Sequence, residues 1–222
     1  NLTKTDDWYA DIADAYNNTG QLIKYRVHTV EAGIDGANTL NKVTDVTRLD
    51  TRYNLVGLVD YYAQNTTSAE ADHKVINEKW DAGKTTGAGG YNKLGQLEKY
   101  TLITTESSTT GADSQLNKIT TTVRTMAAYE LDASTARPVI VNNAPKAIGS
   151  GYDDKGRLIA YRDVITSNES QNKTTEVYFY GTAYDRYGQF QEYRQKTIET
   201  GTDPVTGATI DAQSNIYRHN IN

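Results

Sequence analysis

The chain has 222 residues, no cysteine and a formal net charge of −5. The lack of cysteine excludes a disulfide-stapled fold and a thiolate metal site, and the acidic balance argues against a nucleic-acid partner, which requires a basic face. Only 37% of the residues are hydrophobic, whereas 17 are tyrosines, so the composition favours flat, tyrosine-covered sheets over a deep apolar core. No apolar run is long enough to span a membrane, and no membrane span is expected.

One ten-residue phrase recurs five times along the chain. It reads Tyr, Asn or Asp, two free positions, Gly, one free position, an apolar residue, two free positions and Tyr. Its opening Tyr, its Gly and its closing Tyr are Tyr16, Gly20 and Tyr25; Tyr53, Gly57 and Tyr62; Tyr91, Gly95 and Tyr100; Tyr152, Gly156 and Tyr161; and Tyr184, Gly188 and Tyr193. Recurrence at near-constant spacing predicts tandem supersecondary units that bury their faces against neighbours.

A second motif predicts a sixth, degenerate unit. The segment 40–44 (Leu-Asn-Lys-Val-Thr) returns almost unchanged at 116–120, and each copy has an Asn 12 residues before a Tyr, namely Tyr53 and Tyr129. In the sixth unit Ala133 replaces the turn glycine and Pro138 the closing Tyr. We therefore expect a single repeat array over residues 1–222, with hairpin turns near 17–20, 54–57, 92–95, 130–133, 153–156 and 185–188.

Each unit is predicted to contain two strands. Segments such as 43–53 alternate at period two and are rich in Val, Thr and Tyr, which is typical of half-buried strands, and a second strand such as 21–30 or 96–105 follows each turn. Loops are expected in the polar stretches 31–38, 65–72, 106–114, 167–171 and 201–207. The predicted fold is all-β, with tandem antiparallel β-hairpins forming an elongated, twisted sheet or a solenoid-like fibre.

The phrase itself supplies the chemistry of a hairpin turn. Its Asn or Asp side chain can accept a hydrogen bond from the backbone two residues on, and its Gly accepts the left-handed conformation that a type I turn with a bulge requires. This register predicts the cross-strand pairs Tyr16–Leu22, Tyr53–Val59, Tyr91–Leu97, Tyr152–Leu158 and Tyr184–Phe190. A four-residue loop without the bulge would instead place Gln21 opposite Tyr16, and the sequence leaves both registers open.

The segment Tyr152-Asp153-Asp154-Lys155-Gly156-Arg157-Leu158 resembles the signature of the YD-repeat (Rhs) family, Tyr-Asp-x-x-Gly-Arg-Leu. The phrase at Tyr184 is a looser match, and the Asn-bearing phrases at Tyr16, Tyr53 and Tyr91 are looser still. The resemblance implies secreted or surface-displayed β-hairpin arrays, either spiralling shells or large extracellular repeat proteins. The period of this chain exceeds the usual period of the family, and no toxin, autoproteolytic or receptor module is recognisable, which favours an extended sheet, fibre or stalk.

The sequence offers no constellation for catalysis, and we predict that the protein is not an enzyme. The three histidines, His28, His73 and His219, lack metal-ligand spacing, and no nucleophile elbow or phosphate loop occurs. Weak Ca²⁺ binding by carboxylates in the predicted loops stays open, although no EF-hand or nonapeptide calcium repeat is present. No catalytic residue, cofactor site or metal site is therefore predicted.

Glycosylation sequons begin at several asparagines of the chain. Asn17 is predicted to lie in a hairpin turn, while Asn65, Asn168 and Asn172 are predicted to lie in or beside loops, where a glycan is accommodated. These four asparagines are candidate glycosylation sites.

The leading functional hypothesis is a structural protein, extracellular or at the cell surface, that self-assembles into a filament, sheath or surface layer. Its partner would be itself, through strand edges that pair with another copy or with the continuation of a longer chain. The chain opens at Asn1 without Met and ends in strand-like sequence, so we expect a mature or internal segment. The alternatives are an adhesin or carbohydrate-binding stalk, with glycan partners and with Tyr61, Tyr178 and Tyr180 on its solvent face, or a segment of a Rhs-type toxin-enclosing shell.

Overall fold

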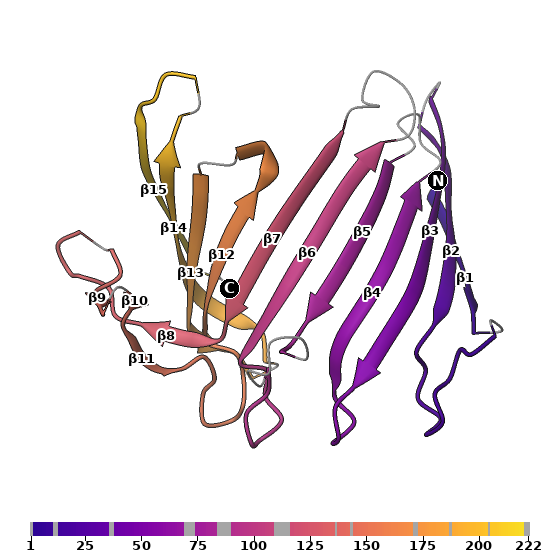
Figure 1. The fold of residues 1–222 in the computed structure, drawn as a ribbon, viewed down its shortest axis with the longest axis horizontal. Coiled ribbons are helices and arrows are strands. Elements are labelled where there is room, and N and C mark those ends of the chain that lie inside the picture. The colour runs from indigo at the N-terminus through magenta and orange to yellow at the C-terminus, as the bar shows by residue number, and fades with distance from the viewer. Residues whose placement is uncertain are drawn as a thin grey trace. The chain divides into compact units, whose positions relative to one another are not determined.

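The fold was taken from a computed structural model, in which the chain is almost entirely antiparallel β-structure (Figure 1), and the all-β prediction is confirmed. The structure describes residues 2–10, 13–35, 38–68, 74–83, 90–108, 116–135, 137–142, 144–170, 173–186, 188–203 and 205–219. Within those ranges the only helix is a single 3-10 turn, η1, at Asn168–Ser170.

The long sheet is open and contains eleven strands in the order β1-β2-β3-β4-β5-β6-β7-β12-β13-β14-β15. Sequence neighbours are therefore sheet neighbours, except where β8 to β11 intervene between β7 and β12. The strands of the long sheet are β1 (Leu2–Tyr9), β2 (Tyr25–Asp35), β3 (Asn38–Tyr53), β4 (Val59–Ser68), β5 (Lys74–Asp81), β6 (Lys99–Ser108), β7 (Asn117–Thr125), β12 (Ala160–Ser167), β13 (Lys173–Tyr184), β14 (Phe190–Thr202) and β15 (Thr209–His219). Two short two-stranded sheets pair β8 (Ala127–Tyr129) with β11 (Ala147–Ser150) and β9 (Ile140–Val141) with β10 (Ala144–Pro145).

The chain divides into two compact units. The first comprises Asn1–Ala88 and Thr101–Thr120, and the second comprises Gly89–Tyr100 and Thr121–Asn222. The second unit holds a small apolar core of Tyr129, Tyr178 and Ile198, in which Tyr178 is fully buried. The ring of Tyr129 meets the ring of Tyr178 edge-on at 5.7 Å between centroids, a favoured aromatic geometry.

Several predicted loops are in fact strand. In the first unit β2 continues to Asp35, which pairs with Asn38, and the ladder sets Glu31 opposite Lys42. Likewise β4 runs to Ser68 and β6 to Ser108. The prediction of loops from polar composition was wrong there, because opposite charges and Thr side chains facing each other across strands stabilise a solvent-exposed ladder.

β3 contains a β-bulge, and the side chains of this strand therefore do not alternate between the two faces of the sheet as predicted. The register between β3 and β4 shifts between Arg48 and Asp50, so Leu49 is skipped in the pairing and is 47% exposed. Leu49 was expected to share a face with Thr51, which is buried at 7% exposure. The extra residue re-aims the side chains of one strand relative to its partner.

The sixth unit departs furthest from the predicted pattern. Its turn begins at Asp132 rather than at residue 130, with Leu131 paired to Pro138, and Tyr129 pairs with Ala147 in the β8–β11 sheet. Residues 126–151 contain β8 to β11 and lie outside the long sheet; we call this segment the excursion (Figure 1). Without the turn glycine and the closing tyrosine, this unit lacks the contacts that hold the other five phrases in the sheet.

Candidate functional site

The five phrases form hairpin turns with one geometry. All five predicted cross-strand pairs are present: Tyr16–Leu22, Tyr53–Val59, Tyr91–Leu97, Tyr152–Leu158 and Tyr184–Phe190. The five phrase glycines have φ between 76° and 84°, the left-handed region that side chains with a Cβ rarely adopt. The bulged register is thereby confirmed, and the alternative that places Gln21 opposite Tyr16 is excluded.

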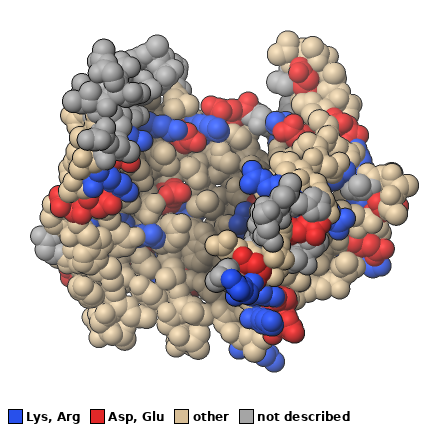
Figure 2. Space-filling view, turned by 180° about the vertical axis from the view of Figure 1, so that it is seen from behind, with Lys and Arg blue, Asp and Glu red and all other residues tan. Residues whose placement is uncertain are grey.

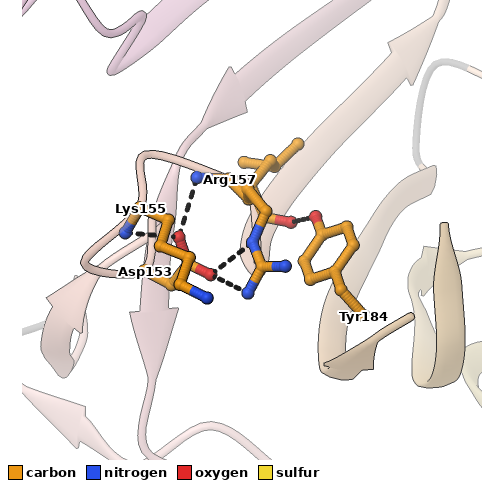
Figure 3. Close-up of polar contacts among 5 residues, drawn as sticks. Asp153, Lys155, Arg157 and Tyr184 are labelled. Atoms are coloured by element: carbon orange, nitrogen blue, oxygen red, sulfur yellow. Dashed lines mark hydrogen bonds and ion pairs between the residues drawn. The ribbon is translucent and has the colours of Figure 1, made fainter. Parts of the chain in front are cut away.

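The Asn or Asp at the second position closes the turn. In the fourth phrase the Oδ1 of Asp153 accepts hydrogen bonds from the Lys155 and Arg157 amides at 3.0 and 2.8 Å (Figure 3). The guanidinium of Arg157 donates to Oδ2 of the same carboxylate from Nε at 2.8 Å. These bonds, led by that from the Arg157 amide, hold the pKa of Asp153 below its ordinary value.

In two of the three Asn-bearing turns a glutamine replaces that arginine. Asn17 donates from Nδ2 to Oε1 of Gln21 at 2.8 Å, and Asn92 donates to Gln96 in the same way at 2.7 Å. In these three phrases the second and sixth positions are matched, Asn with Gln and Asp with Arg, because an amide pairs with an amide and a carboxylate with a guanidinium. The other two phrases carry Leu58 and Gln189 at the sixth position and lack this match.

Successive turns are joined by the hydroxyls of their opening tyrosines. The hydroxyl of Tyr53 donates to the Leu22 carbonyl at 2.7 Å, and that of Tyr152 donates to the Leu97 carbonyl at 2.7 Å. Tyr184 donates to the Leu158 carbonyl, and Arg157 lies over its ring at 4.3 Å (Figure 3). Burial raises the pKa of Tyr152 and of Tyr184, which keeps both hydroxyls protonated as donors at neutral pH.

We expect Tyr152→Phe to lower the free energy of unfolding by about 1 kcal/mol, because it leaves the Leu97 carbonyl without its donor and changes little else. The matched control is Tyr16→Phe, since Tyr16 is 53% exposed and its hydroxyl makes no hydrogen bond with the described residues. Urea denaturation of the native chain and of the two variants measures the change in the free energy of unfolding that each substitution causes. Equal losses in the two variants would contradict a specific role for the hydrogen bond.

The closing tyrosines lie in two aromatic–arginine rows that cross the strands. In the first unit, Arg48 lies over the ring of Tyr62 at 3.8 Å and over that of Tyr25 at 5.5 Å. The row extends to Trp80, stacked on Tyr62 at 5.6 Å, and to Trp8, 6.2 Å from Tyr25. Each contact joins neighbouring strands, so the row ties β1 to β5 together through rings and one guanidinium.

The second unit repeats this arrangement. Arg124 lies over the rings of Tyr161 at 4.0 Å and Tyr100 at 5.7 Å. Phe179 stacks on Tyr161 at 4.9 Å between centroids, and Tyr193 follows at 5.2 Å. The sequence phrase contained all five closing tyrosines, but it gave no signal for the arginines. Their spacing of 76 residues, the same as that between the two Leu-Asn-Lys motifs, is the signal that would have found them.

The two rows differ in the partner of the arginine. Asp163 binds Arg124 with two hydrogen bonds, to Nε at 2.6 Å and to Nη2 at 2.7 Å, and these bonds raise the pKa of Arg124. The residue that pairs with Arg48 in the ladder is Gln64, whose amide donates instead to Glu78 at 2.6 Å. The Nε of Arg48 is buried without a hydrogen-bond partner among the described residues.

The turn of the excursion depends on one carboxylate. Oδ1 of Asp132 accepts hydrogen bonds from the Ser134 hydroxyl at 2.6 Å and from the Ser134 and Thr135 amides at 3.0 and 2.8 Å. These bonds, with that of the Ser134 hydroxyl the strongest, lower the pKa of Asp132 to about 2.

The turn should therefore open only in strong acid. Because the folded pKa lies below the ordinary value of 3.8, the stabilising contribution is complete above that value and is lost as the pH falls toward about 2. Amide NMR shifts of Ser134 and Thr135 followed from pH 5 to pH 1.5 measure it. Asp132→Asn keeps the Oδ1 acceptor but has no carboxyl group to titrate. The amide shifts of Ser134 and Thr135 in that variant should therefore not depend on pH.

The other predicted residues have varied surroundings. Asn65 lies inside β4, with its Oδ1 buried and unpaired among the described residues, so its placement in a loop was wrong. Asn17 is in its predicted turn, Asn168 is exposed in η1, and Asn172 lies outside the described residues.

The Nδ1 of His28 contacts Oδ1 of Asp45 at 2.6 Å. His219 ends β15, and His73 lies outside the described ranges.

The adhesin hypothesis placed three tyrosines on the solvent face, and none of them is fully exposed. Tyr178 is fully buried. Tyr61 and Tyr180 are half-buried, under Arg52 at 5.0 Å and Arg194 at 5.9 Å respectively. An extended row of open rings for stacking sugars is therefore not formed by these residues.

No protein-family model, curated protein or solved structure matches the chain. No helix in the described part of the chain is long and apolar enough to cross a membrane. The described ranges also contain no group of three or more His, Asp or Glu side chains arranged to hold a metal ion.

Proposed function

We propose that the chain is a structural repeat protein, extracellular or at the cell surface, that assembles into a filament, sheath or layer by pairing strand edges. The resemblance of the phrases to YD repeats supports this proposal. The turns and the aromatic–arginine rows supply the rigidity of such a protein, because they join each hairpin to its neighbour by hydrogen bonds and stacked rings.

The observation that carries the proposal is the last strand of the long sheet. β15 is 11 residues long and pairs with β14 without any register shift, and every residue of 211–218 is exposed. Natural edge strands are normally protected by charged side chains (especially Lys), by Pro, by a bulge or by short length. β15 has no Lys, Pro or bulge, and its charged residues, Asp211 and Arg218, lie near its two ends. Its outer row of amides and carbonyls is thus suited to pair with another strand.

The opposite edge has different chemistry. β1 carries Lys4, Asp6 and Asp7, all exposed within eight residues. Charges at these positions are a common protection against edge pairing. The proposal therefore places the first contact between copies at β15.

Proline substitutions at consecutive positions of β15 test the proposal. In an antiparallel edge strand, N–H groups point alternately toward the sheet and away from it, so only one of Ser214→Pro and Asn215→Pro removes an outward donor. That variant should fold with a nearly unchanged unfolding midpoint and should not assemble, whereas the other loses a bond to β14 and unfolds more easily.

Electron microscopy at neutral pH, with sedimentation of the same samples, measures assembly. Regular filaments or sheets of the native chain that the outward proline abolishes would support edge pairing. A native chain that stays monomeric at high concentration, or assemblies that tolerate both prolines, would overturn it. Closed hollow particles would instead favour the shell alternative.

A further inference from the structure

The excursion and the sheet of the second unit enclose two adjoining hollows. One has a volume of about 490 Å³ and the other of about 180 Å³. They share Leu131 of the excursion, Tyr180 of β13 and Arg194 of β14. The smaller hollow is also lined by Lys196, Asn215 and Tyr217, and its described lining contains no carboxylate.

The smaller hollow carries two positive charges that have no acidic partner in the described part of the chain. Lys196 is 5% exposed, and its ammonium donates to the uncharged Oε1 of Gln213 at 2.5 Å. Arg194 is exposed and lies over the Tyr180 ring at 5.9 Å. Among the described residues, neither cation forms an ion pair. A buried ammonium next to a free guanidinium favours an anion in this hollow, since a buried charge is normally paired.

Four carboxylates of the excursion, β14 and β15 are already engaged. Glu192 accepts the hydroxyl of Tyr217, and Asp211 pairs with Arg137. Glu130 pairs with Lys146 at 2.5 Å, and Asp132 accepts the hydrogen bonds of its own turn. None of them neutralises Arg194 or Lys196, so the electrostatic field in the smaller hollow is positive.

The two tyrosines of the hollow are held as fixed walls. The hydroxyl of Tyr180 donates to the Tyr129 carbonyl at 3.0 Å, and that of Tyr217 donates to Glu192. Their rings therefore offer apolar surface without needing a polar partner from a ligand. The amide of Asn215 makes no hydrogen bond with the described residues and is available to donate and accept.

We propose that this hollow binds an acidic sugar residue, one that carries a carboxylate or a sulfate. Its anionic group would accept charge-assisted hydrogen bonds from Arg194 in the field of Lys196, its apolar ring face would lie against the tyrosines, and a hydroxyl would bond to Asn215. These side chains share one face of the sheet, because Tyr180 pairs with Arg194 and Arg194 with Tyr217 in the ladder. Sugar binding on the face thus goes beyond assembly through the edge.

An acidic peptide fits the same field less well. An extended peptide binds a sheet chiefly by adding main-chain hydrogen bonds at an open edge. Here the floor of the hollow is formed by β13, β14 and β15, and the ladders that join these three strands are already complete. The open side of β15 points away from β14, in the plane of the sheet, and not toward the face that carries the hollow. A ligand on this face must therefore be recognised by side chains.

Amide NMR of the whole chain, titrated with glucuronate, glucose sulfate and glucose, tests the proposal. We expect saturable shifts at Tyr180, Arg194, Asn215 and Tyr217 with an acidic sugar, and affinity for neutral glucose that is weaker by about tenfold or more, as loss of a charge-assisted bond implies. Binding of glucuronate alone or of glucose sulfate alone would identify the anionic group. Equal binding of glucose, or equal binding of a poly-glutamate peptide at the same residues, would overturn the proposal.

Two variants and one control locate the charge. Arg194→Gln and Lys196→Met should each weaken binding of the acidic sugar by about tenfold, with the chain still folded by its amide spectrum. Arg218→Gln is the control, because Arg218 is exposed on β15 but points to the opposite face from Tyr217. An equal loss of binding in the control would show that net charge alone attracts the sugar, and the proposed site would be wrong.

Discussion

Asp163→Ala is expected to lower the free energy of unfolding by about 3 to 5 kcal/mol, the usual cost of leaving one charge of a buried pair without its partner. Asp163 is buried at 6% exposure and holds Arg124 through both oxygens. Arg124 in turn lies between the rings of Tyr100 and Tyr161. Loss of the carboxylate therefore affects the whole aromatic–arginine row of the second unit.

Guanidinium denaturation measures this effect, and Glu199→Gln provides the comparison. Glu199 pairs with Lys173 at 2.8 Å, but both side chains are about one-third exposed, so the expected loss is about 1 kcal/mol or less. Asp163→Asn should fall between these variants, since Gln64 already occupies the corresponding place beside Arg48. A loss for Asp163→Ala no larger than that for Glu199→Gln would contradict the role given to the row.

Gly151→Ala is expected to be equally severe. A Cβ at this buried position would lie 2.4 Å from the Ala160 carbonyl oxygen and 2.5 Å from the carbonyl carbon of Met126. Both neighbours are backbone and cannot rotate away, so the substitution must separate strands and should cost about 3 kcal/mol, the upper part of the range for overpacking. The carbonyl of Gly151 also accepts the Ile159 and Ala160 amides at 2.7 and 3.0 Å, and these bonds would be strained.

The control for this substitution lies two residues away. Gly149 is exposed, and a Cβ there would meet nothing within 4 Å. Gly149→Ala should therefore leave the unfolding midpoint nearly unchanged, or raise it slightly by restricting the unfolded chain. If both alanine variants unfolded at the same denaturant concentration, the close approach at Gly151 would not be a constraint on the fold.

The turns could be predicted from the sequence because they depend on local chemistry. An Asn or Asp followed three residues later by Gly fixes both the backbone conformation and the pairing of the flanking residues, and the five observed pairs follow from it. In the first, third and fourth phrases a small residue before the opening tyrosine is a further feature that the prediction missed. Ala15, Gly90 and Gly151 occupy that position, and the carbonyl of each accepts two amides from the returning strand.

The remaining features depend on partners distant in sequence. The place of Asn65 inside β4 depends on its ladder partners, Thr47 and Asn77, in the neighbouring strands, and composition alone suggested a loop. The excursion could not be predicted either, because nothing local distinguishes a degenerate hairpin within the sheet from one that leaves it. Arg124 and Asp163 are 39 residues apart, and only the sheet brings them together.

Three hydroxyl contacts between the described turns run in one direction along the chain. Tyr53, Tyr152 and Tyr184 each donate to a carbonyl that precedes them in sequence, at Leu22, Leu97 and Leu158. During synthesis the acceptor turn is therefore complete before its donor leaves the ribosome, and chains commonly fold from the N-terminal end as they emerge. Each new hairpin can dock on one already formed, so the contacts favour growth of the array in the order of translation and shorten the time that an unpaired strand edge is exposed.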